Sequence, residues 1–124
     1  MMLLNHIAII VSSEKGIDFY KQLGFEEVSR EVRPAAHDEL IYLSNGITML
    51  EIYKDSTHPV RVTNPEALGL RHIGFQVENI ERFLNDVKMI ATIKEDKKGR
   101  FIFLNDPDLL PIEIREVKPS FPKE

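Results

Sequence analysis

The sequence predicts an α+β fold in which two tandem βαβββ modules form a curled mixed sheet. Three observations support this prediction. A short apolar segment opened by a histidine occurs twice, at residues 4–11 and 70–77. Each copy precedes a helix-like segment and then three strand-like segments. Each module also ends in a strand with one glutamate between two aliphatic residues, Glu51 in the first and Glu113 in the second.

The first module begins with a strand over residues 4–11. Successive strand residues point to opposite faces, so Ile7, Ile9 and Val11 share the core face and His6 lies on the opposite one. Ser12 or Ser13 can cap a helix over 14–23, in which Ile17, Tyr20 and Leu23 form the apolar side, and Gly24 suits the left-handed residue that ends it.

The rest of the first module is predicted as three strands. Asn45-Gly46 between apolar segments is a strong signal for a tight hairpin. The expected elements are a strand over 25–33, a loop over 34–38, a strand over 40–43 and a strand over 47–53.

The second module repeats this order. Its helix is expected over 80–88, because Ile80, Phe83, Leu84 and Val87 recur at helical spacing and form an apolar stripe that packs on the core. Around it we expect strands over 70–77, 89–94, 100–105 and 112–117, with turns over 97–99 and 106–108.

The length of 124 residues predicts a single domain. A unit of about 60 residues buries too little surface to be stable alone, so the modules need partners. The predicted division is module 1 over about 1–54, a linker over about 55–68 with Pro59 and Pro65, module 2 over about 69–118, and a loose tail over 119–124.

Composition and charge narrow the function classes. The net charge of −4 argues against a nucleic-acid partner, which requires a basic surface. The absence of cysteine excludes disulfides and thiolate metal sites. No segment approaches the roughly 20 apolar residues of a membrane span, and the apolar start lacks a basic leader. We therefore expect a cytoplasmic protein with no membrane association.

Two histidines and two glutamates occupy matching places in the two modules. If the sheets curl with their non-helix faces inward, His6, Glu51, His72 and Glu113 converge. Neighbouring buried carboxylates without a cation are costly, and a divalent metal removes that cost. Nitrogen and oxygen ligands without sulfur suit Ni, Co, Mn, Fe or Zn, so we predict one such ion in this cleft.

Each of these residues also has a purely structural interpretation. A strand histidine can be a hydrogen-bonded structural residue, and a glutamate between aliphatic residues can face water on an edge strand. Loop residues His37 and His58 are interpreted as surface residues, although His37 could reach the mouth of a cleft. Arg115 shares the face of Glu113 and either neutralises an anionic substrate or forms a salt bridge. The basic residues between 94 and 100 are interpreted as a solvated hairpin.

Several segments together resemble the vicinal oxygen chelate superfamily, of which glyoxalase I is the best-known member. The resemblance extends over nearly the whole chain. The most specific parts are Asp18 to Phe25 and Asp106-Pro107-Asp108, and one departure is Leu109, where the family usually has glycine. The matching segments are residues 5–9, 18–25, 49–52, 69–75, 103–108 and 112–113.

The resemblance implies a glyoxalase I-like enzyme related to lactoylglutathione lyase. In glyoxalase I, the positions matched by His6, Glu51, His72 and Glu113 hold the metal. A small substrate would bind through two adjacent oxygens and react through an enediolate-type intermediate. Glu113 would move a proton between neighbouring carbons, and Glu51 is a candidate second base.

The same resemblance leaves alternatives open. Some members bind antibiotics without chemistry, as bleomycin-resistance proteins do, but these generally lack the ligand set. Thiol transferases and ring-cleaving dioxygenases of the superfamily use three ligands, without the one at the position of Glu51. The resemblance also implies a homodimer, in which each site lies within one chain or draws His6 and Glu51 from one chain and His72 and Glu113 from its mate. Contacts for the glutathione carboxylates are missing after His6, so another substrate is expected.

Overall fold

The computed structural model describes residues 1–117, and the predicted tail over 119–124 lies outside that range. The chain divides into two compact units, the first ending at Val60 and the second beginning at Arg61. Within residues 1–117, no helix has the length and apolar character needed to cross a membrane.

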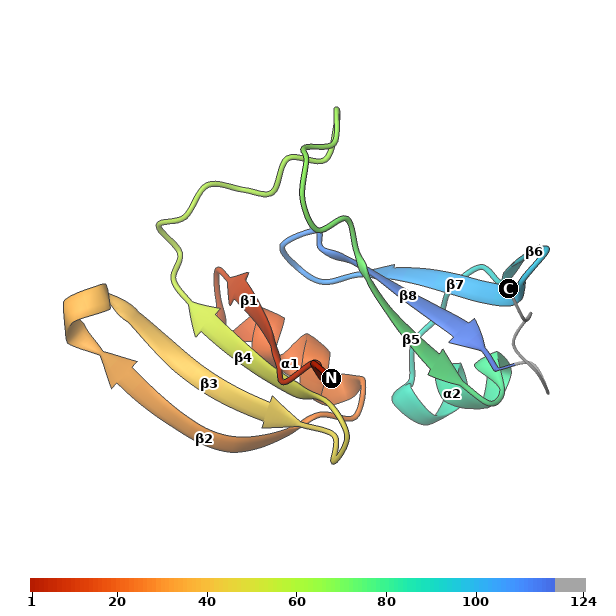
Figure 1. Ribbon diagram of the computed structural model, residues 1–124, viewed down its shortest axis with the longest axis horizontal. Helices are drawn as coiled ribbons and strands as arrows, with labels where there is room; N and C mark the ends of the chain where they lie inside the picture. The colour runs from red at the N-terminus through yellow and green to blue at the C-terminus, as the bar shows by residue number, and fades with distance from the viewer. Residues whose placement is uncertain (118–124) are drawn as a thin grey trace. The chain divides into compact units, whose positions relative to one another are not determined.

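The first unit is a four-stranded mixed sheet with one α-helix (Figure 1). Its strands lie in the order β1-β4-β3-β2, in which β1 is parallel to β4 and the other neighbours are antiparallel. The elements are β1 (Ile7–Val11), α1 (Glu14–Gln22), β2 (Glu26–Arg33), the short 3-10 helix η1 (Pro34–Ala36), β3 (Asp38–Ser44) and β4 (Met49–Lys54).

The core of this unit lies between α1 and one face of the sheet. Ile9 and Val11 are buried, whereas Ala8 and Ile10 are exposed, so β1 alternates as its sequence predicts. Ile17 and Tyr20 of α1 are fully buried, and a Cβ added to Gly16 would lie 2.6 Å from the Cβ of Val11. The helix therefore packs directly on β1, with no room for a side chain at Gly16.

The ends of α1 are capped as the sequence predicts. Ser13 accepts a hydrogen bond from the backbone N–H of Lys15 at its start. After the helix, Gly24 adopts a φ of +115°, and its N–H donates to the carbonyl of Lys21.

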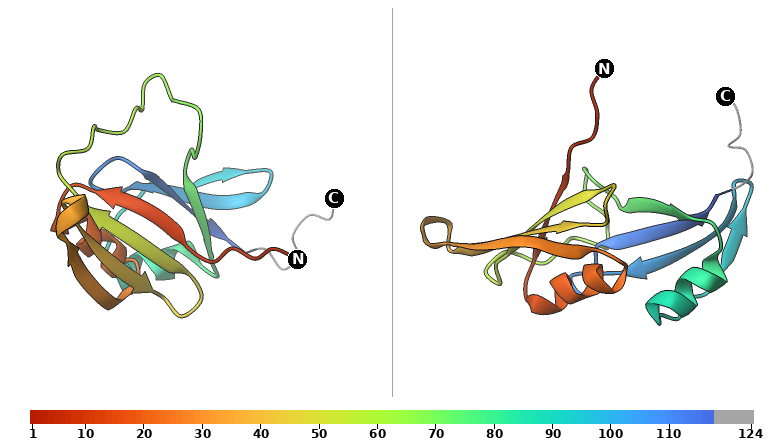
Figure 2. Two further views of the ribbon diagram at one scale, coloured as in Figure 1. Left: turned by 60° about the vertical axis from the view of Figure 1, so that its left-hand side comes forward. Right: turned by 90° about the horizontal axis from the view of Figure 1, so that it is seen from below.

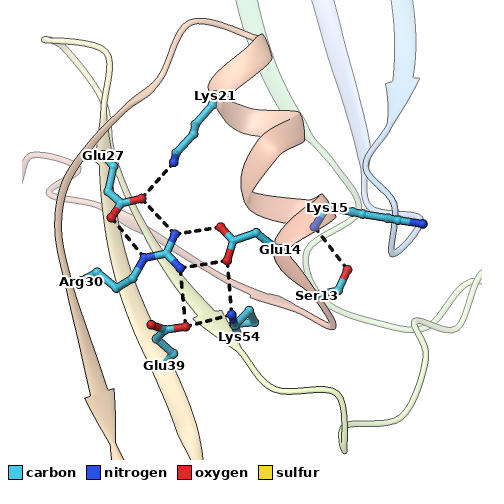
Figure 3. Close-up of polar contacts among 8 residues, drawn as sticks. All are labelled: Ser13, Glu14, Lys15, Lys21, Glu27, Arg30, Glu39 and Lys54. Atoms are coloured by element: carbon cyan, nitrogen blue, oxygen red, sulfur yellow. Dashed lines mark hydrogen bonds and ion pairs between the residues drawn. The ribbon is translucent and has the colours of Figure 1, made fainter.

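A network of charged side chains connects α1 to the sheet (Figure 3). Arg30 of β2 donates to both carboxylate oxygens of Glu14, each at 2.8 Å, and also contacts Glu27. Lys54 of β4 lies 3.2 Å from Glu14 and 2.9 Å from Glu39. Hydrogen bonds from Arg30 lower the pKa of Glu14 to about 2.

The second unit has the same topology. Its strands lie in the order β5-β8-β7-β6, with β5 parallel to β8 and the other neighbours antiparallel (Figure 2). The predicted α+β class with two βαβββ modules is confirmed, and each module builds its own curled mixed sheet. The elements are β5 (Ile73–Val77), α2 (Ile80–Val87), β6 (Lys94–Asp96), β7 (Gly99–Asn105) and β8 (Pro111–Glu116).

The core of the second unit again lies on the helix side of the sheet. Ile80 of α2 is fully buried, and the rest of the predicted apolar stripe is half-buried. Asn79 caps α2 by accepting from the N–H of Arg82, and Glu116 of β8 accepts from the N–H of Ile80. The buried aliphatic residues of its strands are Ile73, Ile102, Leu104, Ile112 and Ile114.

Two expectations about strand bounds are wrong. The opening strands begin at Ile7 and Ile73, so each histidine lies just before its strand. In the second unit, the residue of β8 opposite His72 is Pro111, which has no N–H to donate to the strand ladder.

The strand expected over 89–94 is instead β6, at 94–96. Asp96 accepts from the N–H of Lys98 and closes a tight turn, which fixes the pairing of 94–96 with 99–101.

The loop between β7 and β8 is built on a buried aspartate. Asp106 is 2% exposed, and its Oδ1 accepts from the N–H groups of Asp108 and Leu110. The turn predicted over 106–108 is therefore present. Leu109 adopts a φ of +73° there, a conformation that favours glycine.

Candidate functional site

The first candidate pair, His6 and Glu51, lies on the non-helix face of the first unit. Glu51 of β4 is in register with Ala8, two residues after His6, and both side chains extend from the face opposite the core. The Nε2 atom of His6 lies 3.2 Å from Oε2 of Glu51, with the side chains 39% and 18% exposed.

The second pair, His72 and Glu113, has the same placement in the second unit. Glu113 of β8 is in register with Gly74, two residues after His72. The Nε2 atom of His72 lies 3.6 Å from Oε1 of Glu113, and both side chains are half-buried. The repeat seen in the sequence is thus a repeat in register, which brings a histidine and a carboxylate together twice.

The donor atoms of each pair fit a common metal ligand set. Protein nitrogen and oxygen ligands lie about 2.0–2.2 Å from a divalent ion such as zinc, so two ligand atoms on one ion are roughly 3–3.5 Å apart. The separation in the His6 pair falls in this range, and that in the His72 pair is close to it. Imidazole and carboxylate without sulfur agree with the metals expected from the sequence.

Each unit supplies one such pair. Among residues 1–117, no group of three or more metal-binding side chains lies together. A four-ligand site therefore needs both pairs. Their union in one site stays a prediction.

Neighbouring polar groups orient the first pair. The amide oxygen of Asn5 lies 2.7 Å from Nδ1 of His6. An amide oxygen can only accept a hydrogen bond, so this contact requires Nδ1 to carry the proton. In a neutral ring the lone pair is then on Nε2, the atom that faces Glu51. The hydroxyl of Tyr53 donates to Oε1 of Glu51 at 3.1 Å, which raises the pKa of Tyr53. Tyr53 is not among the site residues predicted from the sequence, although its place two residues after Glu51 puts it on the same face.

An arginine has the corresponding place beside the second pair. Nε of Arg115 lies 3.4 Å from Oε2 of Glu113, and the guanidinium also pairs with Asp96 at 2.6 Å. The bond to Asp96 raises the pKa of Arg115. Of the two roles considered for Arg115, the structure shows the salt bridge. Phe103 packs edge-on against the His72 ring, with the ring centroids 5.2 Å apart.

The other two histidines lie outside these pairs. His58 is exposed and lies 3.5 Å from Asp55. His37 is exposed and lines a hollow of about 440 Å³ at the start of α1, which does not include His6 or Glu51. The hollow is formed by Ser12, Ser13, Glu14, His37, Lys54, Asp55, Ser56 and Thr57.

The comparisons with known proteins agree with the fold. YwkD of Bacillus subtilis, an uncharacterized protein, is 38% identical over 122 residues, which cover 91% of this chain and 95% of that protein. The glyoxalase family protein of Enterococcus faecalis has a similar structure, with 36% identity, a TM-score of 0.79, and coverage of 90% of this chain and 95% of that chain.

A further structural likeness is to a characterised enzyme. The trypanothione-dependent glyoxalase I of Leishmania major is 25% identical, with a TM-score of 0.71 and coverage of 94% of this chain and 87% of that chain. A fosfomycin resistance protein of Listeria monocytogenes, whose E126Q mutant is complexed with Mn(II), has a similar fold, with 19% identity, a TM-score of 0.70, and coverage of 96% of this chain and 95% of that chain. The model of the Glyoxalase/Bleomycin resistance protein/Dioxygenase superfamily matches residues 3–114. This chain therefore belongs to that superfamily, the vicinal oxygen chelate superfamily.

Proposed function

We propose that this protein is a metal-dependent glyoxalase I-like enzyme, related to lactoylglutathione lyase, that acts on a small substrate with two adjacent oxygens. The observation that carries the proposal is the repeated register of the two His–Glu pairs. A structural histidine or a solvent-facing glutamate can occur once by chance. The same pair at the same register in two modules is better explained by a shared chemical task.

One divalent ion, chosen from Ni, Co, Mn, Fe and Zn, would be held by His6, Glu51, His72 and Glu113. When bound, such an ion acts as a Lewis acid that polarises substrate oxygens. The amide oxygen of Asn5, 2.7 Å from Nδ1 of His6, would hold a neutral ring with its lone pair on Nε2.

Glu113 is the residue we assign as the general base, which takes a proton from one carbon and returns it to the next. Its neighbour across the parallel ladder is Gly74, where an added Cβ would be 3.6 Å from Oε1 of Glu113. The corresponding neighbour of Glu51 is Ala8, and Oε1 of Glu51 is already bound by Tyr53. Because Gly74 has no side chain, the space beside Oε1 of Glu113 on that side of the ladder is open, and Glu51 is the secondary candidate base.

The test is turnover by the metal-loaded protein on a panel of hemithioacetals and 2-oxoaldehyde adducts. Proton transfer between adjacent carbons predicts deuterium at the product carbon when the reaction runs in D₂O. Glu113→Gln keeps an oxygen ligand but removes the base, so we expect a rate loss of about 10²–10⁴-fold. An unchanged rate in this variant would contradict the assignment, and binding without turnover of any adduct would favour the antibiotic-binding alternative.

We also propose a homodimer as the working assembly, because each module is small for an independent core. Whether a site joins its pairs within a chain or between chains can be tested by mixing inactive His6→Ala and Glu113→Gln chains. If the sites are swapped, a mixed dimer has one intact site and one site with both defects. Activity would then return to at most half of the sites, whereas sites within one chain would give no recovery. A monomer at micromolar concentration would contradict the dimer.

A further inference from the structure

The two carboxylate oxygens of Glu51 have different partners. Oε2 lies 3.2 Å from Nε2 of His6, whereas Oε1 accepts the hydroxyl of Tyr53 at 3.1 Å. The Glu51 side chain is only 18% exposed, so water has limited access to either oxygen. One oxygen is thus directed toward the histidine, and the other is held by a protein donor.

Tyr53 is itself held in place. The guanidinium of Arg33 stacks over its ring, with the central carbon 4.9 Å from the ring centroid. Arg33 is fixed in turn by two hydrogen bonds to Asp38, both 2.7 Å long. These three side chains come from β2, β3 and β4, which are neighbours in the sheet. The hydroxyl that reaches Glu51 is therefore part of a connected set of side chains and not an isolated contact.

The second unit has a similar arrangement with different chemistry. Arg115 lies two residues after Glu113, as Tyr53 lies two residues after Glu51, and its Nε is near Oε2 of Glu113 at 3.4 Å. The other oxygen, Oε1, faces His72. Arg115 stacks on Phe101 at 4.6 Å and pairs with Asp96. In both units, the side chain two residues after the glutamate contacts the carboxylate oxygen that does not face the histidine.

We propose that Tyr53 is a positioning residue that restricts Glu51 to binding the metal through Oε2, and that Arg33 and Asp38 position Tyr53. This inference rests on the proposed metal site. The last torsion of a glutamate is broad, so without a partner on Oε1 the carboxylate rotates and presents either oxygen or both. A fixed carboxylate binds an ion with less loss of freedom, and loss of such an outer partner typically weakens metal binding 10–100-fold.

The experiment compares Tyr53→Phe with the unaltered protein by calorimetric titration with Co²⁺ and by the visible absorption spectrum of the cobalt form. We expect binding about 10-fold weaker in the variant and a changed spectrum, because a freed Oε1 alters the coordination number. Tyr42→Phe is the matched control, since Tyr42 is in register with Glu51 on β3 but its hydroxyl is not bonded to Glu51 within residues 1–117. Arg33→Lys keeps the positive charge but loses the planar guanidinium that stacks on Tyr53 and makes two hydrogen bonds to Asp38. We expect this variant to lose less Co²⁺ affinity than Tyr53→Phe does.

The outcomes separate this inference from the proposed function. If the unaltered protein binds no Co²⁺, the metal site itself is wrong and the role of Tyr53 fails with it. If the unaltered protein binds and Tyr53→Phe binds equally well with the same spectrum, the positioning role alone is overturned. Equal losses in Tyr53→Phe and Tyr42→Phe would also overturn it, because they would show a general effect of hydroxyl removal. Thermal melting of each variant checks that the fold is kept.

Discussion

The substrate is where we expect this protein to depart from glyoxalase I. The glutathione adduct of methylglyoxal carries two carboxylates, and in a partly buried site cationic side chains must balance them. The strand after His6 has no charged residue before Ser12. Helix α2 ends at Val87, and only six residues, 88–93, separate it from β6, which leaves little room for a basic loop.

The arginines that could substitute for those contacts already have acidic partners. Arg71 lies 2.8 Å from Glu66, Arg115 lies 2.6 Å from Asp96, and Arg100 pairs with Glu81 and Glu116. Recruiting any of them to a substrate would break an existing ion pair. The lysines at 94, 97 and 98 are exposed, and exposed ion pairs contribute only about 0–1 kcal/mol.

The size of the effect follows from the two carboxylates. Each one left without a partner in a partly buried site costs about 1–3 kcal/mol. Two such losses reduce binding or turnover about a hundredfold or more, since about 1.4 kcal/mol corresponds to a factor of ten. The chemistry at the adjacent oxygens is unaffected, so a substrate without these carboxylates escapes the loss.

The assay compares kcat/KM of the metal-loaded protein for two hemithioacetals of methylglyoxal, one made with glutathione and one with 2-mercaptoethanol. We expect the smaller, uncharged adduct to be preferred by about a hundredfold. Equal or better turnover of the glutathione adduct would refute the reasoning. Loss of that activity in Arg115→Gln or Arg71→Gln would then identify the basic contact.

Three further predictions concern stability. Gly16→Ala should lower the free energy of unfolding, measured by urea titration, by about 1–2 kcal/mol. The added methyl group would lie 2.6 Å from the Cβ of Val11, and this clash outweighs the gain in helix propensity. A higher free energy of unfolding would contradict the packing of α1 on β1. Leu109→Gly should raise the melting temperature by a few degrees. Leucine is strained at a φ of +73°, which glycine adopts readily, and the half-exposed Leu109 side chain contributes little packing. An unchanged melting temperature would mean that Leu109 is unstrained. The pKa of Glu14, about 2, is depressed by Arg30, so this pair stabilises above about pH 4.5 and the stabilisation is lost as the pH falls toward 2. Glu14→Gln should therefore cost about 1 kcal/mol at neutral pH, after discounting for a side chain that is 44% exposed, and little at pH 2; an equal cost at both would contradict the pairing.

Much of the fold was predictable because the two modules repeat the same periodicities. Alternation in β1 and β4 placed the aliphatic residues in the core and His6 and Glu51 on the other face, and the structure has this arrangement. The helices were predictable from their capping residues and apolar spacing. These features depend on interactions between residues close in sequence, and periodicity reports them directly.

The parts that the sequence did not predict depend on pairing between distant residues. The strand expected over 89–94 has suitable composition, but the hairpin turn at 97–98 fixes the register and places β6 at 94–96. The contact between Tyr53 and Glu51, and the support that Arg33 gives to Tyr53, require knowledge of which strands are neighbours. Strand order and register come from tertiary packing, so a single sequence indicates them weakly.

The most direct test of the central claim is the metal content of the protein. Protein purified without chelator, or loaded and desalted, should contain close to one divalent ion per chain by mass spectrometry of the metals. His72→Ala removes a nitrogen ligand and should lose that ion, whereas His58→Ala, which alters an exposed histidine beside Asp55, should keep it. Full metal occupancy in His72→Ala would contradict the assignment of His6, Glu51, His72 and Glu113 to one metal site.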